Sequence, residues 1–303
     1  MIVRSRPGAF RMLVTMHGSI VPQILPQMLF AAILGAVVAS LHIAYPSLMP
    51  AYSFAPFAVF GISLSIFLGF RNNAAYDRWW EARRQWGTLV AEVRNLARAS
   101  TTFIGPDAPE RRHLLRMSSV FAHALRAGLR HEEAEAEMQI AEDVATMKTY
   151  RGFRTPAAAV LRSMGEDLYQ MRVRGMLDLT GARVLDERLA GFADVQAACE
   201  RISNTPLPFA YSLLVHRTAY VYCFLLPFAV VNTLGWLTPV FVAIVAYTFF
   251  GLDALSEELE EPFGRADNDL ALNALCRTIE IEVAEATGES PPAAPEPIGY
   301  VLD

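Results

Sequence analysis

An apolar run that passes straight into a charged segment is the feature that most limits how this chain folds. Residues 54–70 (FAPFAVFGISLSIFLGF) carry no charge, and RNNAAYDRWWEARRQWG follows without any proline. Seventeen helical residues measure roughly 26 Å, close to the thickness of bilayer hydrocarbon. Residues such as Ala74, Ala75, Glu81 and Ala82 are strong helix formers. The pattern therefore predicts one helix that crosses a membrane and continues beyond its surface.

Composition points to a protein that is partly in the membrane and partly outside it. The chain is 53% hydrophobic and 19% charged, too apolar for an ordinary soluble domain and too charged for a wholly embedded one. The net charge of −5 argues against nucleic acid as a partner. Cys199, Cys223 and Cys276 lie far apart without metal-ligand spacing, so they are interpreted as small buried hydrophobes. We expect no cofactor.

Three further apolar segments accompany residues 54–70, namely residues 28–45, 219–234 and 237–252. Together they predict four transmembrane helices in two hairpins, joined by residues 46–53 and by Gly235-Trp236. Basic residues precede the first and third segments and follow the second: Arg4, Arg6, Arg11, Arg71, Arg78, Arg83, Arg84 and Arg217. This distribution predicts that both termini lie in the cytoplasm.

The segments outside the membrane are expected to be mostly helical. Stretches such as EAEAEMQIAEDVATM show helical periodicity, and no convincing alternating strand occurs. The fold class is therefore an all-α membrane protein, with four transmembrane helices in two hairpins and a large helical cytoplasmic part. The expected parts are a cytoplasmic N-terminal segment (1–27), spans one and two (28–70), a cytoplasmic helical region (71–218), spans three and four (219–252) and a cytoplasmic C-terminal region with a Pro-rich, extended tail (253–303).

Two parallel stripes mark the second span. Ile62, Ile66 and Phe70 recur four residues apart and form a stripe of large apolar side chains. The residue before each of them is small, Gly61, Ser65 and Gly69. Small residues at this spacing allow membrane helices to approach closely. Repeated around a symmetry axis, such a helix would line a narrow apolar pore, although a plain core helix explains the same periodicity.

Three features together resemble the bestrophin family, in its bacterial branch. They are the stretch FGISLSIFLGFRNNAAYDRWWEARRQWG, the two hairpins around a helical insert, and ELEEPFGRADNDL after the last span. The resemblance implies a homopentameric ion channel in the bacterial inner membrane. It also implies that Ile62, Ile66 and Phe70 form three rings of a pore neck.

The resemblance further implies a wide cytoplasmic vestibule with a second constriction below the neck. Leu168 and Met171, in EDLYQMRVRGMLD, are the candidates for it. A core position is the alternative for Met171.

Animal bestrophins bind Ca²⁺ with an acidic run that follows a Pro-Phe-Gly motif. Here that run reads Arg265, Ala266, Asp267, Asn268, Asp269, and calcium needs six to eight oxygen ligands. Asp269 and Asp267 remain the only candidates for a metal site, so we do not expect conduction to require calcium.

Ion selectivity is predicted from the neck residues. Two of the three rings are aliphatic and lack the positive ring edges of an aromatic side chain, and net acidity enriches cations at the mouth. This favours monovalent cations, with an anion-selective channel as the alternative.

Other classes of function find less support. An enzyme is not expected, because GxSxG, Walker and HExxH motifs are absent from the sequence. A secondary transporter usually shows internal repeats and ionisable residues at midmembrane depth. The first two spans lack such residues, and the sequence shows no repeat of fixed period.

Overall fold

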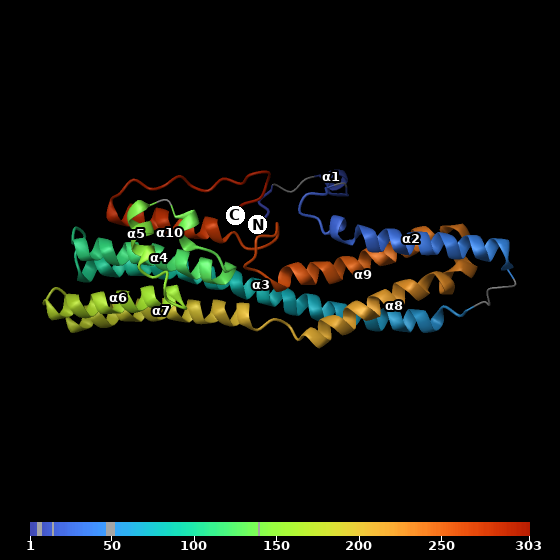
Figure 1. Ribbon diagram of the computed structural model, residues 1–303, viewed down its shortest axis with the longest axis horizontal. Helices are drawn as coiled ribbons and strands as arrows, with labels where there is room; N and C mark the ends of the chain where they lie inside the picture. The colour runs from blue at the N-terminus through green and yellow to red at the C-terminus, as the bar shows by residue number, and fades with distance from the viewer. Residues whose placement is uncertain (5–7, 14, 47–51, 139) are drawn as a thin grey trace. The chain divides into compact units, whose positions relative to one another are not determined.

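The structure is a computed structural model that describes residues 1–4, 8–13, 15–46, 52–138 and 140–303. Helices dominate it (Figure 1). In chain order they are α1 (Ala9–Leu13), α2 (Val21–Ala44), α3 (Ala55–Phe103), α4 (Pro109–Arg130), η2 (Ala134–Glu137), α5 (Ala141–Lys148), α6 (Pro156–Val173), α7 (Leu179–Asn204), α8 (Phe209–Leu234), η3 (Gly235–Leu237), α9 (Thr238–Glu260) and α10 (Leu272–Thr287). Among the described residues, β-pairing is limited to isolated bridges of Val301 with Ile2 and Ile298. The all-α fold class is confirmed.

Helix α3 is one unbroken helix of 49 residues, as predicted. At 1.5 Å per residue it measures roughly 74 Å, more than twice the thickness of bilayer hydrocarbon. Its buried side chains recur every three or four residues, starting with Leu64, Leu68, Arg71 and Ala75. This is the spacing of one helix face, so α3 packs along a single stripe and leaves the opposite face uncovered by its own chain.

The chain divides into two compact units, and α3 contributes to both. Unit 1 consists of Met1–Arg4, Trp80–Thr205 and Pro262–Asp303, and unit 2 of Ser5–Trp79 and Pro206–Glu261. The divisions of the chain thus fall after Arg4, Trp79, Thr205 and Glu261. The parts expected from the sequence end at residues 27, 70, 218 and 252.

Unit 2 contains the apolar helices. Residues 21–44, 55–103 and 209–260 form three stretches that are long and apolar enough to cross a membrane. The third comprises α8 and α9, which lie side by side as a hairpin (Figure 1). The short helix η3 connects them. The four expected spans therefore fall on α2, α3, α8 and α9. Most of the expected connection 46–53 lies outside the described residues.

Several helices begin earlier than hydropathy suggests. Helix α2 starts at Val21 rather than at residue 28, and Pro22 fits its first turn, where backbone N–H groups have no partner within the helix and a missing one costs nothing. Helix α8 starts at Phe209, ten residues before the expected span. Hydropathy marks the apolar part of a helix, whereas the ends depend on capping and on tertiary contacts.

The core of unit 2 joins all four of these helices. Leu64 and Leu68 of α3 pack in one cluster with Ile24 of α2, Leu226 of α8 and Val242 of α9. Aromatic rings reinforce the same core. The Tyr222 ring lies 5.7 Å from that of Phe60 and 5.2 Å from that of Phe249, both in edge-on arrangements, which are favourable for aromatic quadrupoles.

Unit 1 is a helical bundle built around α4, which packs against α6 and α10, while α6 also packs against α7. The rings of Phe121 and Phe192 meet in its core at 5.2 Å. After α10 the chain is not helical, as the tail composition predicts, and it returns to the first residues. The backbone N–H of Val3 donates to the carbonyl of Tyr300 at 2.8 Å.

Candidate functional site

The candidate site is the uncovered apolar stripe on α3. The side chains of Ile62, Ile66 and Phe70 are 61%, 52% and 62% exposed in the single chain. They stand on the face opposite the buried Leu64 and Leu68. Large apolar side chains that remain exposed in the single chain indicate a surface that faces lipid, another protein or a pore.

The small residues beside this stripe play unequal roles. Gly61 is buried, and a Cβ atom there would lie 2.7 Å from the Tyr222 hydroxyl oxygen. Its missing side chain lets α8 approach α3 within the same chain. A Cβ atom at Gly69 would meet nothing within 4 Å. Ser65 lies between them and donates its hydroxyl to the Gly61 carbonyl at 2.8 Å.

A groove of about 520 Å³ runs beside the stripe within unit 2. Ile62 and Ile66 line it from α3, and Tyr222 and Phe249 line it from α8 and α9. The groove gives the stripe an apolar edge that side chains of another helix could fill.

A buried ion pair lies directly after the stripe. Arg71 follows Phe70, and its side chain is only 4% exposed. It pairs with the carboxylate of Asp253 on α9, while the second oxygen of Asp253 lies 2.6 Å from Nδ1 of His216 on α8. One carboxylate therefore links α3, α8 and α9 at the end of the stripe.

Glu260 extends this link toward the end of α9. Its carboxylate lies 3.6 Å from the Arg71 guanidinium and also accepts from the backbone N–H of Leu207 at 3.0 Å. Its carbonyl accepts from Nε of Arg78 at 2.6 Å. Arg71 and Arg78 were interpreted from the sequence only as charges at a membrane boundary. The missed signal is Asp253, the first acidic residue after the long apolar run of α9, because an ionisable residue in such a segment usually pairs.

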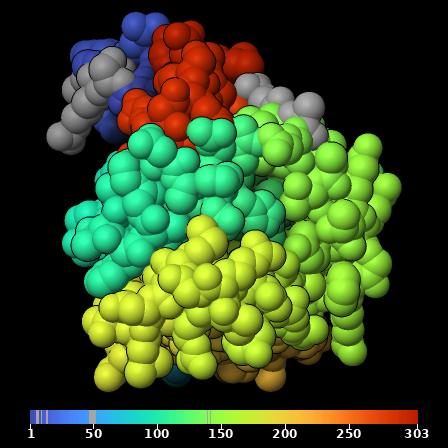
Figure 2. All heavy atoms as spheres, turned by 90° about the vertical axis from the view of Figure 1, so that its left-hand side faces the viewer, coloured from blue at the N-terminus to red at the C-terminus, as the bar shows by residue number. Residues whose placement is uncertain are grey.

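Both candidates for a second constriction lie in unit 1. Leu168 and Met171 are 4% and 2% exposed in the single chain, and for Met171 this is the core position given as the alternative. Helix α6 ends at Val173, two residues after Met171. Exposed apolar side chains nearby include Val173 at 62% and Leu179 at 72%. They flank the connection between α6 and α7. Figure 2 shows this part of the chain in yellow.

The segment after Pro262-Phe263-Gly264 is organised around an arginine. Nε and Nη2 of Arg265 contact the two carboxylate oxygens of Glu132 at 2.6 and 2.7 Å. These hydrogen bonds raise the pKa of Arg265 and lower the pKa of Glu132. Nη1 of Arg265 also lies 3.2 Å from the carboxylate of Asp303, and Nη2 lies 3.7 Å from that of Glu137.

The two acidic candidates for a metal site are Asp267 and Asp269. Asp269 is 4% exposed, and its carboxylate accepts from the backbone N–H of Ala266 at 2.7 Å, so it helps to shape the loop. In the part of the chain that the structure describes, no three His, Cys, Asp or Glu side chains gather as a metal site would require.

Comparisons with known proteins agree with this architecture. The family described as Bacterial/Fungal Bestrophin protein matches residues 1–285. The voltage-dependent anion channel-forming protein mll4386 of Mesorhizobium japonicum is 53% identical over 292 residues, which cover 96% of this chain and 94% of that protein. The voltage-dependent anion channel-forming protein YneE of Escherichia coli K12 is 40% identical over 292 residues, with 96% and 95% covered.

Solved structures show the same fold. The crystal structure of a bacterial bestrophin homologue from Klebsiella pneumoniae superposes with a TM-score of 0.82 at 35% sequence identity, covering 88% of this chain and all of that one. A family match over nearly the whole length, relatives that are covered over nearly their full length and a shared fold lead to one conclusion. The chain belongs to the bacterial and fungal bestrophin family.

Proposed function

We propose that this chain assembles as a homopentameric membrane channel for monovalent ions, with Ile62, Ile66 and Phe70 as its hydrophobic neck. The observation that carries the proposal is the exposure of these three side chains on a helix whose other face is fully packed. Family membership supports an ion channel rather than an enzyme.

The neck would control conduction through dehydration. Water is poorly held in a narrow apolar tube, and an ion without polar partners in a low-dielectric space costs many kcal/mol. The width of the tube then depends on the size of the side chains that line it. Ile66 would form the middle ring, so the size of its side chain should affect conductance most.

Cations are the ions we favour. Ile62 and Ile66 offer no positive ring edges to an anion, and the chain carries a net charge of −5. Anions are the second candidate, because relatives with 53% and 40% identity are named voltage-dependent anion channel-forming proteins.

We further propose that both termini lie on the cytoplasmic side of the inner membrane. The pairing of Val3 with Tyr300 supports a common side for the two ends. The basic residues that flank the apolar helices favour the cytoplasm as that side.

Substitution of Ile66 tests the proposal. In planar bilayers under asymmetric NaCl, Ile66→Ala should raise the single-channel conductance severalfold, because a wider neck admits more water around the ion. Ile66→Phe should move the reversal potential toward that of chloride, because it adds positive ring edges. Ile244→Ala, at a 58% exposed position on α9, is the matched control and should change neither quantity. An unchanged conductance in Ile66→Ala would remove Ile66 from the conduction barrier.

A further inference from the structure

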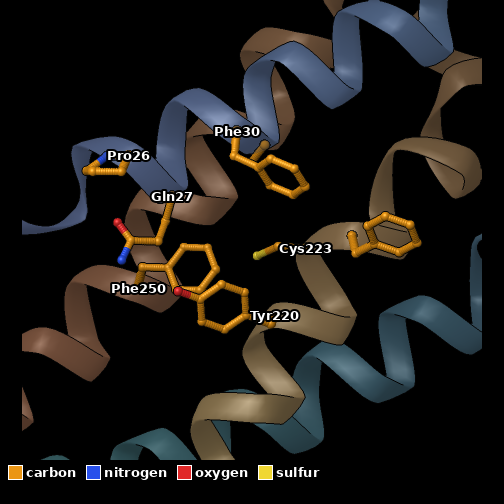
Figure 3. Close-up of a pocket in the computed structure, with 8 residues that line it drawn as sticks. Pro26, Gln27, Phe30, Tyr220, Cys223 and Phe250 are labelled. Atoms are coloured by element: carbon orange, nitrogen blue, oxygen red, sulfur yellow. The ribbon is translucent and has the colours of Figure 1, made fainter.

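Unit 2 contains a second apolar space, away from the stripe on α3. It is a cavity of about 250 Å³ between α2, α8 and α9. Its lining residues are Pro26, Gln27, Phe30, Ala31, Tyr220, Cys223, Phe224 and Phe250. Figure 3 shows the Cys223 side chain pointing into the space between Phe30, Phe250 and Tyr220.

The lining selects an apolar occupant. Four of the eight residues are aromatic, and Pro26, Ala31 and Cys223 add no strong hydrogen-bonding side chain. Cavities walled by apolar side chains stay dry and take up hydrocarbon, as a cavity of about 150 Å³ takes up benzene. Water is therefore a poor occupant of this larger space.

Two polar groups of the lining lie at one end of the cavity, the Tyr220 hydroxyl and the Gln27 amide. The Tyr220 hydroxyl has no hydrogen-bond partner among the described residues, and Figure 3 shows it on the same side as the Gln27 amide. A hydroxyl at the end of an apolar space is stabilised when it donates to an acceptor. The best occupant therefore combines a hydrocarbon body with a hydrogen-bond acceptor near one end.

We propose that this cavity binds one acyl chain of a membrane phospholipid, with the lipid ester carbonyl accepting a hydrogen bond from Tyr220. Phe30 and Phe224, at 56% and 49% exposure, line the space and are open to the surroundings of α2 and α8. Both helices belong to stretches long and apolar enough to cross a membrane. Phospholipid chains are the hydrocarbon that surrounds such helices.

A bound lipid would lie beside the ion-pair network at the end of the stripe. The Tyr220 ring is 4.7 Å from the Phe250 ring and 4.9 Å from the His216 ring. His216 in turn contacts Asp253 at 2.6 Å. The lipid would thus help to hold Tyr220 against the residues that fasten α8 and α9 to α3. The lipid site itself does not depend on conduction, so its test reads binding alone.

The first test counts lipids by native mass spectrometry. The full-length protein is stripped of lipid in detergent and titrated with 1-palmitoyl-2-oleoyl phosphatidylglycerol. We expect one retained lipid per chain. Ala31→Leu fills the cavity and should weaken retention at least tenfold, whereas Ala32→Leu, the same change at a neighbouring residue outside the lining, should not. Tyr220→Phe removes only the hydroxyl and should weaken retention roughly fivefold, the worth of one ordinary hydrogen bond.

The second test keeps the cavity open and does not depend on Ala31→Leu folding. Phe224→Trp places a fluorescent reporter in the lining, and the protein is reconstituted with phosphatidylcholine brominated on its acyl chains. The extra fluorescence over the parent protein should be quenched strongly. Equal lipid retention in Ala31→Leu and Ala32→Leu would overturn the proposal. Absence of quenching from Phe224→Trp would do so as well, and would indicate that a neighbouring copy of the chain covers the cavity.

Discussion

Arg71 shows how strongly burial changes the contribution of an ion pair to stability. Its pair with Asp253 has side chains only 4% and 7% exposed. The pair between Arg201 and Glu81 has the same chemistry but is 62% and 33% exposed. A buried charge that loses its partner costs about 3–5 kcal/mol, whereas an exposed ion pair contributes about 0–1 kcal/mol.

This contrast gives a prediction for substitutions at the two arginines. Arg71→Met should lower the free energy of unfolding by about 3–5 kcal/mol, because it leaves Asp253 charged and buried. Adding Asp253→Leu should restore most of the loss. Arg201→Met, the exposed counterpart, should cost less than about 1 kcal/mol. Unfolding of the detergent-solubilised protein in denaturant measures all three. Equal costs for Arg71→Met and Arg201→Met would show that the buried pair does not hold the helices together.

The buried carboxyl of Asp143 leads to a second prediction, about how stability depends on pH. Asp143 lies on α5 in unit 1 and is 2% exposed. Burial raises the pKa of its carboxyl from 3.8 to about 6, with nearby Glu280 and Glu289 adding to the effect and Arg116 opposing it. The unfolded carboxyl ionises near pH 4, but the folded one keeps its proton until about pH 6. The free energy of unfolding that Asp143 contributes therefore falls as pH rises from 4 to 6. Above pH 6 the protein remains destabilised by the buried, ionised carboxylate.

Asp143→Asn should remove this cost. At pH 7.5 the variant should be more stable than the parent by up to about 3 kcal/mol, since one pKa unit corresponds to about 1.4 kcal/mol. The difference should shrink toward zero at about pH 3, below the pKa of the unfolded carboxyl, where the folded and unfolded parent are both protonated. Denaturant unfolding of the two proteins at both pH values measures it. A variant that is less stable at pH 7.5 would mean that the charge of Asp143 is needed for packing.

At the scale of helices, the contact between α3 and α8 rests on a missing side chain. A Cβ atom at Gly61 would come within 2.7 Å of the Tyr222 hydroxyl, whereas Gly69 on the same helix has free space around it. Gly61→Ala should therefore destabilise unit 2 by about 1–3 kcal/mol, the usual cost of overpacking. Gly69→Ala should stabilise the helix by about 0.5–1 kcal/mol. Thermal unfolding compares the two.

Tyr222→Phe serves as the internal control for this clash. It removes the hydroxyl that a Cβ atom at Gly61 would meet, so the double variant Gly61→Ala/Tyr222→Phe should recover stability relative to Gly61→Ala alone. If the double variant is no more stable than Gly61→Ala alone, the loss of stability does not come from a clash with the Tyr222 hydroxyl.

The helices also show which parts of the fold a sequence can reveal. The continuity of α3 past Phe70 was predictable, because helix propensity and hydropathy are local properties. The link between Arg71 and Asp253 was not, because it joins residues 182 positions apart. The orientation of α6 likewise depends on tertiary packing. Leu168 and Met171 lie on its buried face, and no local pattern distinguishes them from the exposed Val173.

In the whole molecule, a single chain does not provide a complete pore. Ile62, Ile66 and Phe70 form a site only if other copies of α3 stand around a common axis, because one helix cannot enclose a pore. The sequence indicated the stripe itself through its four-residue spacing. The number of copies rests on the family resemblance.

The last prediction is therefore the mass of the assembly. Five copies of a 33.5 kDa chain weigh about 170 kDa, and native mass spectrometry of the purified protein should show this species after detergent is removed. Ile66→Ala should keep the same mass, because its side chain is exposed in the single chain and the α3 core consists of Leu64 and Leu68. That result would assign any change in conductance to the neck rather than to assembly. A monomer or dimer in the parent protein would contradict a pore built from α3, since two helices cannot surround an axis with the stripe facing inward.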